Sequence, residues 1–348
     1  MQETLAGLQV VRFRYGPDYW EKLAYNGGIM ANLKKNRLLY CMLPFFFLAE
    51  LIALLRLMFG VRPTAIHAHW IVPQGIVMAL AAMTVRAKPR LICTVHGSDL
   101  SALQGSLWRW LRRWVTACSD QITTVSEQLK SRLVSEGCAA GRIGVIPMGT
   151  DLRGLFVPGC GAPGKAAILF VGRLVLGKGA DLLIRAMPEV IAKHPDATLL
   201  IIGGGPERDN LGRLVLQLEL TQYVTFAGPI AQDELARHYR DASLLVVPSR
   251  EEGFGLVVVE ALGCGCPVAA SDLPSLRTLL GEGQFGLLFP AGAIDKLSVA
   301  ICEMLSNEAA SRSMAWQGRS SMLDQYDWHE ISRRYAALIA LPSAMEAA

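Results

Sequence analysis

The chain reads LLVVPSREEGFGLVVVEAL from Leu244 to Leu262. A strand-like apolar run, Leu244–Val247, is followed by a glycine-containing turn and a second apolar segment. If Gly255 opens a helix, Glu252 lies on the loop before it and Glu260 lies just over one turn inside it. Both carboxylates then reach a polyhydroxyl ligand held over the helix N-terminus, where backbone N–H groups also favour phosphate. This arrangement suits a sugar that is joined to a nucleotide.

The β-branched run Val257–Val259 opposes the helix, because its intrinsic propensity favours a strand. The surrounding sequence nevertheless alternates strands and helices throughout. Strands are predicted at Leu8–Phe13, Ala65–Ala68, Leu91–Val95, Gln121–Val125, Ile143–Ile146, Ala167–Val171, Ala197–Ile202, Tyr223–Phe226 and Leu244–Val247. This order implies parallel sheets with right-handed crossovers, and ligands in such sheets bind beyond the carboxyl ends of the strands.

The length of 348 residues exceeds the size at which one core usually stops growing, so we expect two domains. The Gly/Pro-rich stretch Val157–Gly164 is the predicted linker. We place the first domain at residues 1–156, the second at 165–330, and a C-terminal helix and tail at 331–348. A hydrophobic share of 52% fits a globular α/β protein, and a net charge of +4 gives no indication of a nucleic-acid partner.

One segment, Leu38–Leu57, has the composition of a membrane helix. Its part without charged residues, Leu38–Ala49, is too short to span a bilayer and contains Pro44, so we expect an interfacial or core helix. The stretch Trp108–Trp114 predicts a basic amphipathic helix suited to a headgroup layer, with a solvated face over a packed stripe as the equal alternative. No secretory signal opens the chain and its cysteines lack paired spacing, so we expect a cytoplasmic protein, peripheral on the inner face of the cell membrane.

Two glycine-containing loops follow predicted strands in the second half. Arg173 and Lys178 lie in the first, where a guanidinium and an ammonium can hold a diphosphate. Solvated basic residues in a surface loop are the alternative. The turn Gly203-Gly204-Gly205-Pro206 lets backbone approach a phosphate or nucleoside, although a plain tight turn explains it as well.

Histidines follow two strands of the first half. His96 ends a buried strand, where its imidazole can donate to a sugar hydroxyl, and Asp99 can cap the next segment. A satisfied structural histidine is the alternative. His67 and His69 alternate along a strand, so both imidazoles point to one face. Since no acidic or cysteine ligand accompanies them, we expect no metal site.

These motifs together resemble the family-4 retaining glycosyltransferases of the GT-B fold, over nearly the whole chain and most strongly over Phe170–Phe289. The resemblance implies an α/β architecture with two Rossmann-like, doubly wound domains facing a central cleft. It implies transfer of a hexosyl unit from a UDP- or GDP-sugar to a glycan or a polyprenyl- or other lipid-linked acceptor, in polysaccharide or glycoconjugate synthesis. It implies no metal or other cofactor.

The resemblance also assigns roles to residues. Glu252 matches the carboxylate that contacts the donor sugar, and His96 matches a histidine near it, which makes these two the candidate catalytic residues. Arg173 and Lys178 match the diphosphate-binding pair, and Glu260 matches the carboxylate that holds the ribose hydroxyls. Further donor-side positions are Gly204, Gly205, Gly253, Phe254, Gly255 and Leu256. The acceptor-side positions are His69, Asp99 and Asn26.

The chain departs from the family pattern in two places. Relatives usually begin with a βαβ unit of about 30 residues or more before the segment matched by Leu8–Tyr15, so we expect an incomplete first domain with exposed apolar neighbours. Ser275 and Thr278 stand where relatives often carry glycine and glutamate. Two other functions therefore remain open. One is a nucleotide-sugar-binding protein with impaired catalysis, and the other is a different GT-B enzyme, such as a sugar-nucleotide epimerase or a phosphorylase.

Overall fold

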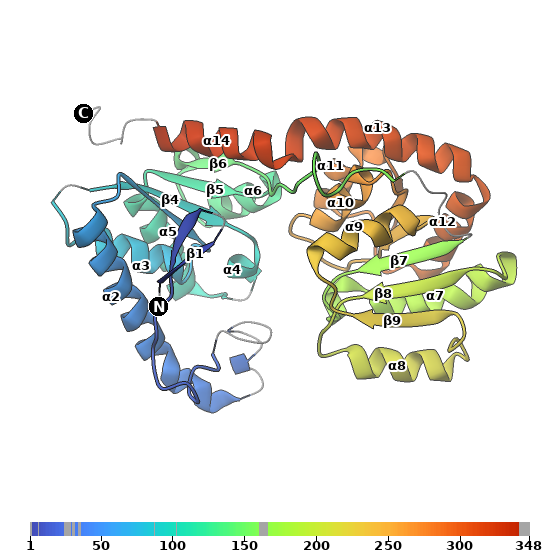
Figure 1. Ribbon diagram of the computed structural model, residues 1–348, viewed down its shortest axis with the longest axis horizontal. Helices are drawn as coiled ribbons and strands as arrows, with labels where there is room; N and C mark the ends of the chain where they lie inside the picture. Colours follow the sequence, from blue (N-terminus) through green and yellow to red (C-terminus); the bar gives the residue numbers. More distant parts are fainter. Residues whose placement is uncertain are drawn as a thin grey trace. The chain divides into compact units, whose positions relative to one another are not determined.

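The computed structural model describes residues 2–5, 7–23, 29, 32–33, 36–86, 88–101, 103–159 and 166–340. The chain divides into two compact units, Met1–Val145 with Ala337–Ala348, and Ile146–Ala336 (Figure 1). The division lies ahead of the predicted linker Val157–Gly164, of which residues 160–164 are outside the described part. Each unit contains a parallel β-sheet of its own, which confirms the α/β class predicted from the sequence.

The second unit is built on a six-stranded parallel sheet. Its strands are β7 (Ala167–Val171), β8 (Thr198–Ile202), β9 (Val224–Gly228), β10 (Leu244–Val247), β11 (Val268–Ser271) and β12 (Leu287–Phe289). They are ordered β12-β11-β10-β7-β8-β9, and each neighbouring pair is parallel. The chain therefore proceeds outward from β7 in one direction and then, from β10, in the other. The carboxyl edge between β7 and β10 is the topological switch point where ligands bind in such sheets.

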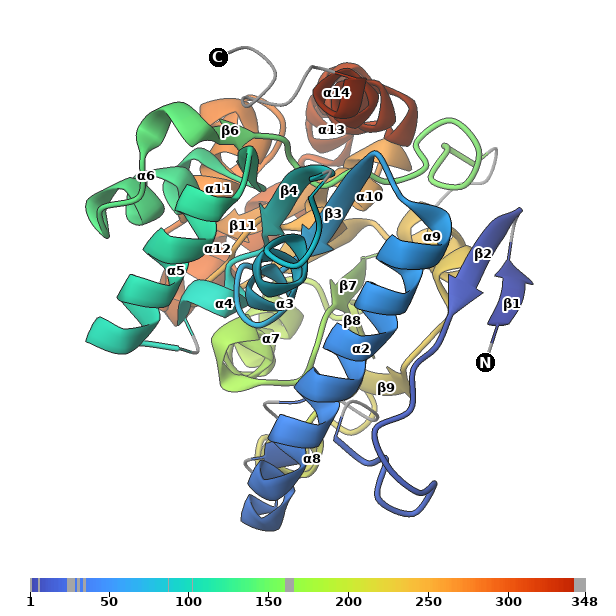
Figure 2. The same cartoon turned by 90° about the vertical axis from the view of Figure 1, so that its left-hand side faces the viewer.

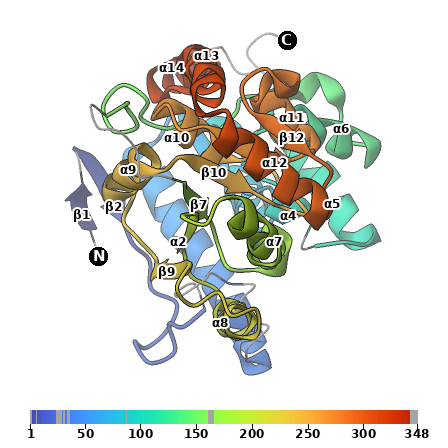
Figure 3. The same cartoon turned by 90° about the vertical axis from the view of Figure 1, so that its right-hand side faces the viewer.

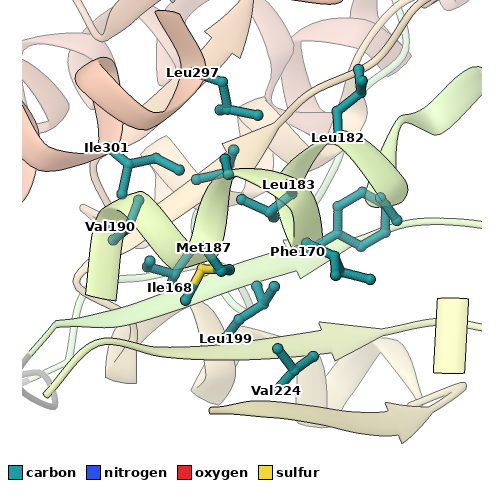
Figure 4. Close-up of a cluster of buried hydrophobic side chains, with 14 of the residues drawn as sticks. Ile168, Phe170, Leu182, Leu183, Met187, Val190, Leu199, Val224, Leu297 and Ile301 are labelled. Atoms are coloured by element: carbon teal, nitrogen blue, oxygen red, sulfur yellow. The ribbon is translucent and has the colours of Figure 1, made fainter. Parts of the chain in front are cut away.

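Helices cover both faces of this sheet (Figure 3). The helices that follow β7 along the chain are α7 (Ala180–Lys193), α8 (Arg208–Gln217), α9 (Gln232–Asp241), α10 (Leu256–Gly263), α11 (Pro274–Leu279), α12 (Ile294–Ser306) and α13 (Glu308–Tyr326), with short 3-10 turns η3 (Leu176–Lys178) and η4 (Gly281–Gly283). The last helix, α14 (Trp328–Ala340), belongs to the second unit only as far as Ala336. A large buried cluster lies where α7 and α12 meet the sheet, and Figure 4 shows Ile168, Leu183, Met187, Leu199 and Ile301 within it. Burial of each such side chain contributes about 1.5–3 kcal/mol, so this cluster fixes the strands whose ends carry the candidate site.

The segment Leu256–Gly263 is helical, and Gly255 precedes it with a φ of 103°. The sequence-based helix is thus confirmed in spite of its three valines. Val258 and Val259 are fully buried. Relative to alanine, valine destabilises a helix by at most about 0.7 kcal/mol per residue. Burying its side chain stabilises the fold by about 1.5 kcal/mol or more, so packing outweighs helix propensity here.

The first unit contains a four-stranded parallel sheet in the order β3-β4-β5-β6. Its elements are η1 (Arg37–Met42), α2 (Leu43–Val61), β3 (Ala65–His69), α3 (Gln74–Ala82), β4 (Arg90–Val95), α4 (Ser98–Ser101), α5 (Ser106–Cys118), β5 (Gln121–Thr124), α6 (Glu127–Ser135), η2 (Ala140–Arg142) and β6 (Ile143–Val145). The strand predicted from Leu8 does form, as β2 (Leu8–Val11). It pairs antiparallel with β1 (Gln2–Leu5) in a separate two-stranded sheet, so the prediction of a parallel neighbour was wrong for it.

The apolar segment that follows is only partly covered. Of α2 only Phe46 and Met58 are buried and the other residues are half-buried or exposed, which does not fit the predicted alternative of a core helix. By length and composition Arg37–Val61 could cross a bilayer, and only 6% of its most apolar window is buried. Figure 2 shows α3 between α2 and α5, and α3 contacts both.

The start and the end of the second unit are joined at Asp327, which is buried. Thr150 forms a parallel bridge with Asp327, and the N–H of Leu152 donates to the Asp327 carboxylate at 3.2 Å. The indole N–H of Trp328 donates to the Gly149 carbonyl at 2.9 Å. Within this unit, the incoming chain and the last helices are therefore held together by hydrogen bonds.

Candidate functional site

Two loops meet at the switch point of the second unit. Residues 172–179 follow β7 and residues 248–255 follow β10, its neighbour in the sheet. The N–H of Arg250 donates to the Gly177 carbonyl at 2.8 Å, and the Arg250 guanidinium binds the Asp181 carboxylate through two bonds of 2.7 Å. The loops are therefore fastened to each other by backbone and by a bidentate ion pair.

Gly179 permits this close approach. Its φ is 71°, and a Cβ at this position would lie 1.9 Å from the Pro248 carbonyl oxygen. No side chain fits at that distance, so the contact between the two loops requires glycine.

Lys178 and Glu252 are brought together across this contact. The Lys178 Nζ lies 2.5 Å from Oε2 of Glu252, and the Ser249 hydroxyl donates to the same oxygen at 3.4 Å. The Ser275 hydroxyl donates to the Glu252 carbonyl at 3.0 Å, which fixes the backbone of the loop. Arg173 is exposed, and its guanidinium has no hydrogen-bond or ion-pair partner among the described residues. The site thus offers an ammonium paired with a carboxylate and a guanidinium that faces solvent.

Glu260 lies in a second cluster, on α10. Its side chain is only 4% exposed, and it accepts hydrogen bonds from the Tyr239 hydroxyl at 2.8 Å and the Gln232 amide at 3.3 Å. Burial raises the pKa of Glu260 to about 7, although both hydrogen bonds oppose the shift. Sequence reasoning missed Tyr239 and Gln232. Their spacing of seven residues on the amphipathic helix α9 places them on one face and was the available signal.

The glycine turn after β8 lies against the loop after β7. A Cβ on Gly203 would lie 1.9 Å from the Gly172 carbonyl oxygen, and the N–H of Leu174 donates to the Gly204 carbonyl at 2.9 Å. Gly205 is similarly close to Leu174, with 2.4 Å between its hypothetical Cβ and the Leu174 carbonyl oxygen. Three strand ends, of β7, β8 and β10, therefore present adjoining glycine-lined backbone.

The remaining donor-side positions contribute mainly backbone. The Phe254 ring is buried and packs on Tyr326 with 5.6 Å between ring centroids, so its side chain faces the interior. Gly253 precedes it and Leu256 opens α10. The first N–H groups of a helix lack intrahelical partners and attract anions.

In the first unit, three imidazoles gather at the carboxyl ends of β3 and β4. His69 Nδ1 lies 3.0 Å from His96 Nε2, and His67 Nε2 lies 2.6 Å from the Thr94 hydroxyl. The ring centroids of His67 and His69 are 4.5 Å apart, which confirms that both face the same side of the strand. Burial lowers the pKa of His67 and of His96 to about 4, so both rings are neutral at pH 7.

Asp99 connects the loops after β3 and β4. Its carboxylate accepts from the N–H of Ile71 at 3.0 Å and the N–H of Gly97 at 2.9 Å, so it fastens the loop Trp70–Pro73 instead of acting as a cap ahead of the following helix. Asn26 lies outside the described residues. In the parts of the chain that are described, no group of three or more His, Cys, Asp or Glu residues could hold a metal ion.

Two parallel-sheet units with loops of this kind at the strand ends are the architecture of the GT-B class of glycosyltransferases. The structure of sucrose-phosphate synthase from Thermosynechococcus elongatus superposes with a TM-score of 0.79 at 26% identity, over 97% of this chain and 84% of that one. The structure of the Anabaena protein HepE, solved in complex with UDP and glucose, superposes with a TM-score of 0.73 at 21% identity. The superposition covers 84% of this chain and 82% of HepE.

The sequence matches the models "Glycosyltransferase Family 4" over residues 9–153 and "Glycosyl transferases group 1" over residues 161–321. An uncharacterized glycosyltransferase of Methanocaldococcus jannaschii is 32% identical in sequence, over 76% of this chain and 72% of the length of that protein. A GDP-mannose-dependent alpha-(1-6)-phosphatidylinositol monomannoside mannosyltransferase of Mycolicibacterium smegmatis is 28% identical over 72% of this chain and 70% of its own. The chain belongs to the family-4, group 1 glycosyltransferases, and it is an enzyme that transfers a glycosyl group from a nucleotide sugar.

Proposed function

We propose that this enzyme transfers a hexosyl unit, with retention of anomeric configuration, from a UDP- or GDP-sugar to a glycan or lipid-linked acceptor. The observation that carries the proposal is the Lys178–Glu252 ion pair at the switch point, with the exposed Arg173 in the same loop. Relatives support the donor class, since one depends on GDP-mannose and HepE binds UDP and glucose.

Each charged group then has one task. Lys178 and Arg173 bind the diphosphate, and the ammonium exchanges the Glu252 carboxylate for a phosphate oxygen when the donor enters. Glu252, released from Lys178, accepts from a hydroxyl of the donor hexose. Glu260, positioned by Tyr239 and Gln232, accepts from the ribose hydroxyls.

The proposed reaction needs no metal or other cofactor. The bond between the anomeric carbon and the phosphate oxygen breaks, and the electron pair leaves with the diphosphate, where Lys178 and Arg173 stabilise the added charge. The acceptor oxygen forms its bond to the anomeric carbon on the same face, and its proton passes to the departing phosphate oxygen. His96, neutral at pH 7, can hydrogen-bond to a hydroxyl beside the reacting centre.

Calorimetric titration with UDP and GDP tests the donor site. The wild-type enzyme should bind at least one of these nucleotides. Glu260→Gln should lower the affinity for that nucleotide, because it removes the charged acceptor for the ribose hydroxyls. Glu252→Gln should abolish transfer without unfolding the protein. Glu251→Gln is the matched control, since Glu251 is the exposed neighbour on the same loop. Normal turnover by Glu252→Gln would refute the assigned role.

Donor hydrolysis followed by proton NMR tests retention without a known acceptor. With UDP-glucose or GDP-mannose, the released sugar should appear first as the α-anomer, before mutarotation. The β-anomer appearing first would contradict retention. Nucleotide binding without any turnover would favour an impaired binding protein. Interconversion of UDP-GlcNAc without an acceptor would favour an epimerase, and phosphate-dependent release of the sugar a phosphorylase.

We further propose that the enzyme binds peripherally to the cytoplasmic face of the membrane through the helices α2 and α5. Phe45, Leu48 and Phe59 on α2 are more than half exposed. On α5, Trp110 is exposed beside the exposed arginines Arg109 and Arg113, whereas Arg112 is buried in an ion pair with Glu136 at 2.6 Å. Apolar side chains flanked by cations suit an anionic headgroup layer.

Vesicle flotation measures this association. Wild type should float with phosphatidylcholine vesicles that contain phosphatidylglycerol and less with phosphatidylcholine alone. Leu48→Ser combined with Phe59→Ser should lower flotation, while Trp316→Ala, an exposed tryptophan of the second unit, should not. Equal flotation of all variants would exclude this surface. Dimer formation that the serine variants abolish would indicate a second copy as the partner instead.

A further inference from the structure

Trp70, the first residue after β3, has an unusual backbone for a bulky side chain. Its φ is 68°, in the left-handed region, which non-glycine residues rarely adopt and which costs of order 1–3 kcal/mol. Ile71 and Val72, which follow it, are buried, whereas the Trp70 side chain is 43% exposed. The loop thus places its large aromatic ring in solvent and its smaller aliphatic residues in the core.

The surrounding structure fixes this conformation on both sides of the residue. The N–H of Trp70 donates to the Thr94 carbonyl at 2.8 Å, and its carbonyl accepts from the N–H of Gly75 at 3.0 Å. The next N–H, of Ile71, donates to the buried Asp99 carboxylate. Strained backbone of this kind persists only where the surrounding contacts hold it, and it clusters at functional positions.

Beside the indole lie polar groups of a particular kind. The His96 ring centroid is 5.4 Å from that of Trp70, and His96 hydrogen-bonds to His69. Burial lowers the pKa of His69 as it does that of His96, so both imidazoles are neutral at pH 7. Whichever of the two donates in this bond, their outer nitrogens, His69 Nε2 and His96 Nδ1, present one donor and one acceptor. Within the described residues, no other hydrogen bond occupies them.

A flat apolar ring next to a donor–acceptor pair matches the surface of a pyranose. One face of a hexopyranose carries C–H groups that pack on an aromatic ring, and its rim carries hydroxyls that both donate and accept. We propose that Trp70 is the platform on which a hexopyranose ring of the substrate stacks, with the His69–His96 pair bound to its hydroxyls. This inference rests on the proposed glycosyl transfer and adds a subsite to it.

Three substitutions separate the ring from the backbone. Trp70→Gly and Trp70→Asn remove the indole but tolerate positive φ, so the loop keeps its conformation. Trp70→Phe keeps an aromatic face. Trp316→Ala serves as the control for the loss of an exposed tryptophan elsewhere. Thermal midpoints near that of wild type would establish that the loop variants fold, and Trp70→Asn replaces Trp70→Gly if the glycine variant does not.

Two measurements identify which sugar stacks there. In the donor arm, calorimetry compares UDP with UDP-glucose and GDP with GDP-mannose. If Trp70 holds the donor hexose, Trp70→Gly lowers affinity for the nucleotide sugar about tenfold and leaves the nucleotide unchanged. In the acceptor arm, saturation-transfer NMR follows methyl α-glucopyranoside and methyl α-mannopyranoside with the nucleotide bound. If Trp70 holds the acceptor, their signal disappears in Trp70→Gly and returns in Trp70→Phe.

The two proposals fail in different ways. If wild type binds neither nucleotide, the proposed donor site is wrong. If wild type binds nucleotide and sugar, and Trp70→Gly and Trp70→Asn bind both equally well, the platform is refuted while glycosyl transfer stands. An equal loss of affinity for the nucleotide and for the nucleotide sugar in a folded variant would assign Trp70 a structural role. That result would also overturn the inference.

Discussion

The buried carboxylate of Glu260 destabilises the folded protein when it is charged. Burial raises its pKa from 4.5 to about 7, so the folded state holds a proton that the unfolded state releases between these pH values. Stability therefore falls as pH rises from 4.5 to about 7, by about 3 kcal/mol from this group, and levels off above. A ligand hydroxyl that donates to the carboxylate would recover part of this cost.

Glu260→Gln should remove that decline. We expect the free energy of unfolding of the variant, measured by denaturant titration from pH 4.5 to 8, to depend less on pH than that of wild type. The difference between the two proteins isolates Glu260 from other titrating groups. Parallel curves would mean that the carboxylate is already charged in the folded protein at pH 5.

Lys178 provides a second residue-scale prediction. If its ammonium binds the diphosphate, Lys178→Ala should weaken the binding of UDP by about 1.5–3 kcal/mol. The binding of uridine should stay almost unchanged, because only UDP carries the phosphates. Calorimetry of both ligands measures the difference. Lys193→Ala, at the C-terminal end of the following helix α7, is the control. An equal loss for UDP and uridine would show that Lys178 acts on the nucleoside or on the fold.

At the scale of elements, the contact between the loops after β7 and β10 depends on Gly179. Gly179→Ala should destabilise the protein and weaken nucleotide binding, because its Cβ meets the Pro248 carbonyl oxygen at 1.9 Å. Gly292→Ala is matched for backbone, with a φ of 84°, but has nothing within 4 Å of its Cβ. We expect about 1 kcal/mol for Gly292→Ala and clearly more for Gly179→Ala by thermal unfolding. Similar values would mean that the loops separate freely.

The sequence predicted the elements that carry the site better than the contacts within it. The helix after Gly255 and the strand ends around it followed from apolar runs and glycines. Lys178 and Glu252 were each placed at the end of a parallel strand, but their direct ion pair was not predicted. Tyr239 was not found, since its hydroxyl reaches Glu260 only through the packing of α9 on α10. The same limit applies to Asp99. Local sequence suggests a cap, whereas its partner Ile71 is 28 residues away.

At the scale of the whole molecule, the residues proposed to bind the diphosphate and the ribose all belong to one compact unit, Ile146–Ala336. We predict that a fragment of these residues folds and binds the same nucleotide as the full chain, with an affinity within about tenfold, because the switch-point loops and Glu260 are all internal to it. Circular dichroism and calorimetry test this. A folded fragment without nucleotide affinity would show that the first unit completes the binding site.

Asp327 has a practical consequence for this unit. Because its carboxylate accepts from Leu152 while the neighbouring indole donates to Gly149, the segment from Gly149 to Trp328 begins and ends at one place. A segment whose termini adjoin can be transplanted as a cassette into a surface loop of another protein. Chimaeras that exchange this cassette between relatives should inherit the nucleotide preference of the cassette's source and the acceptor preference of the host.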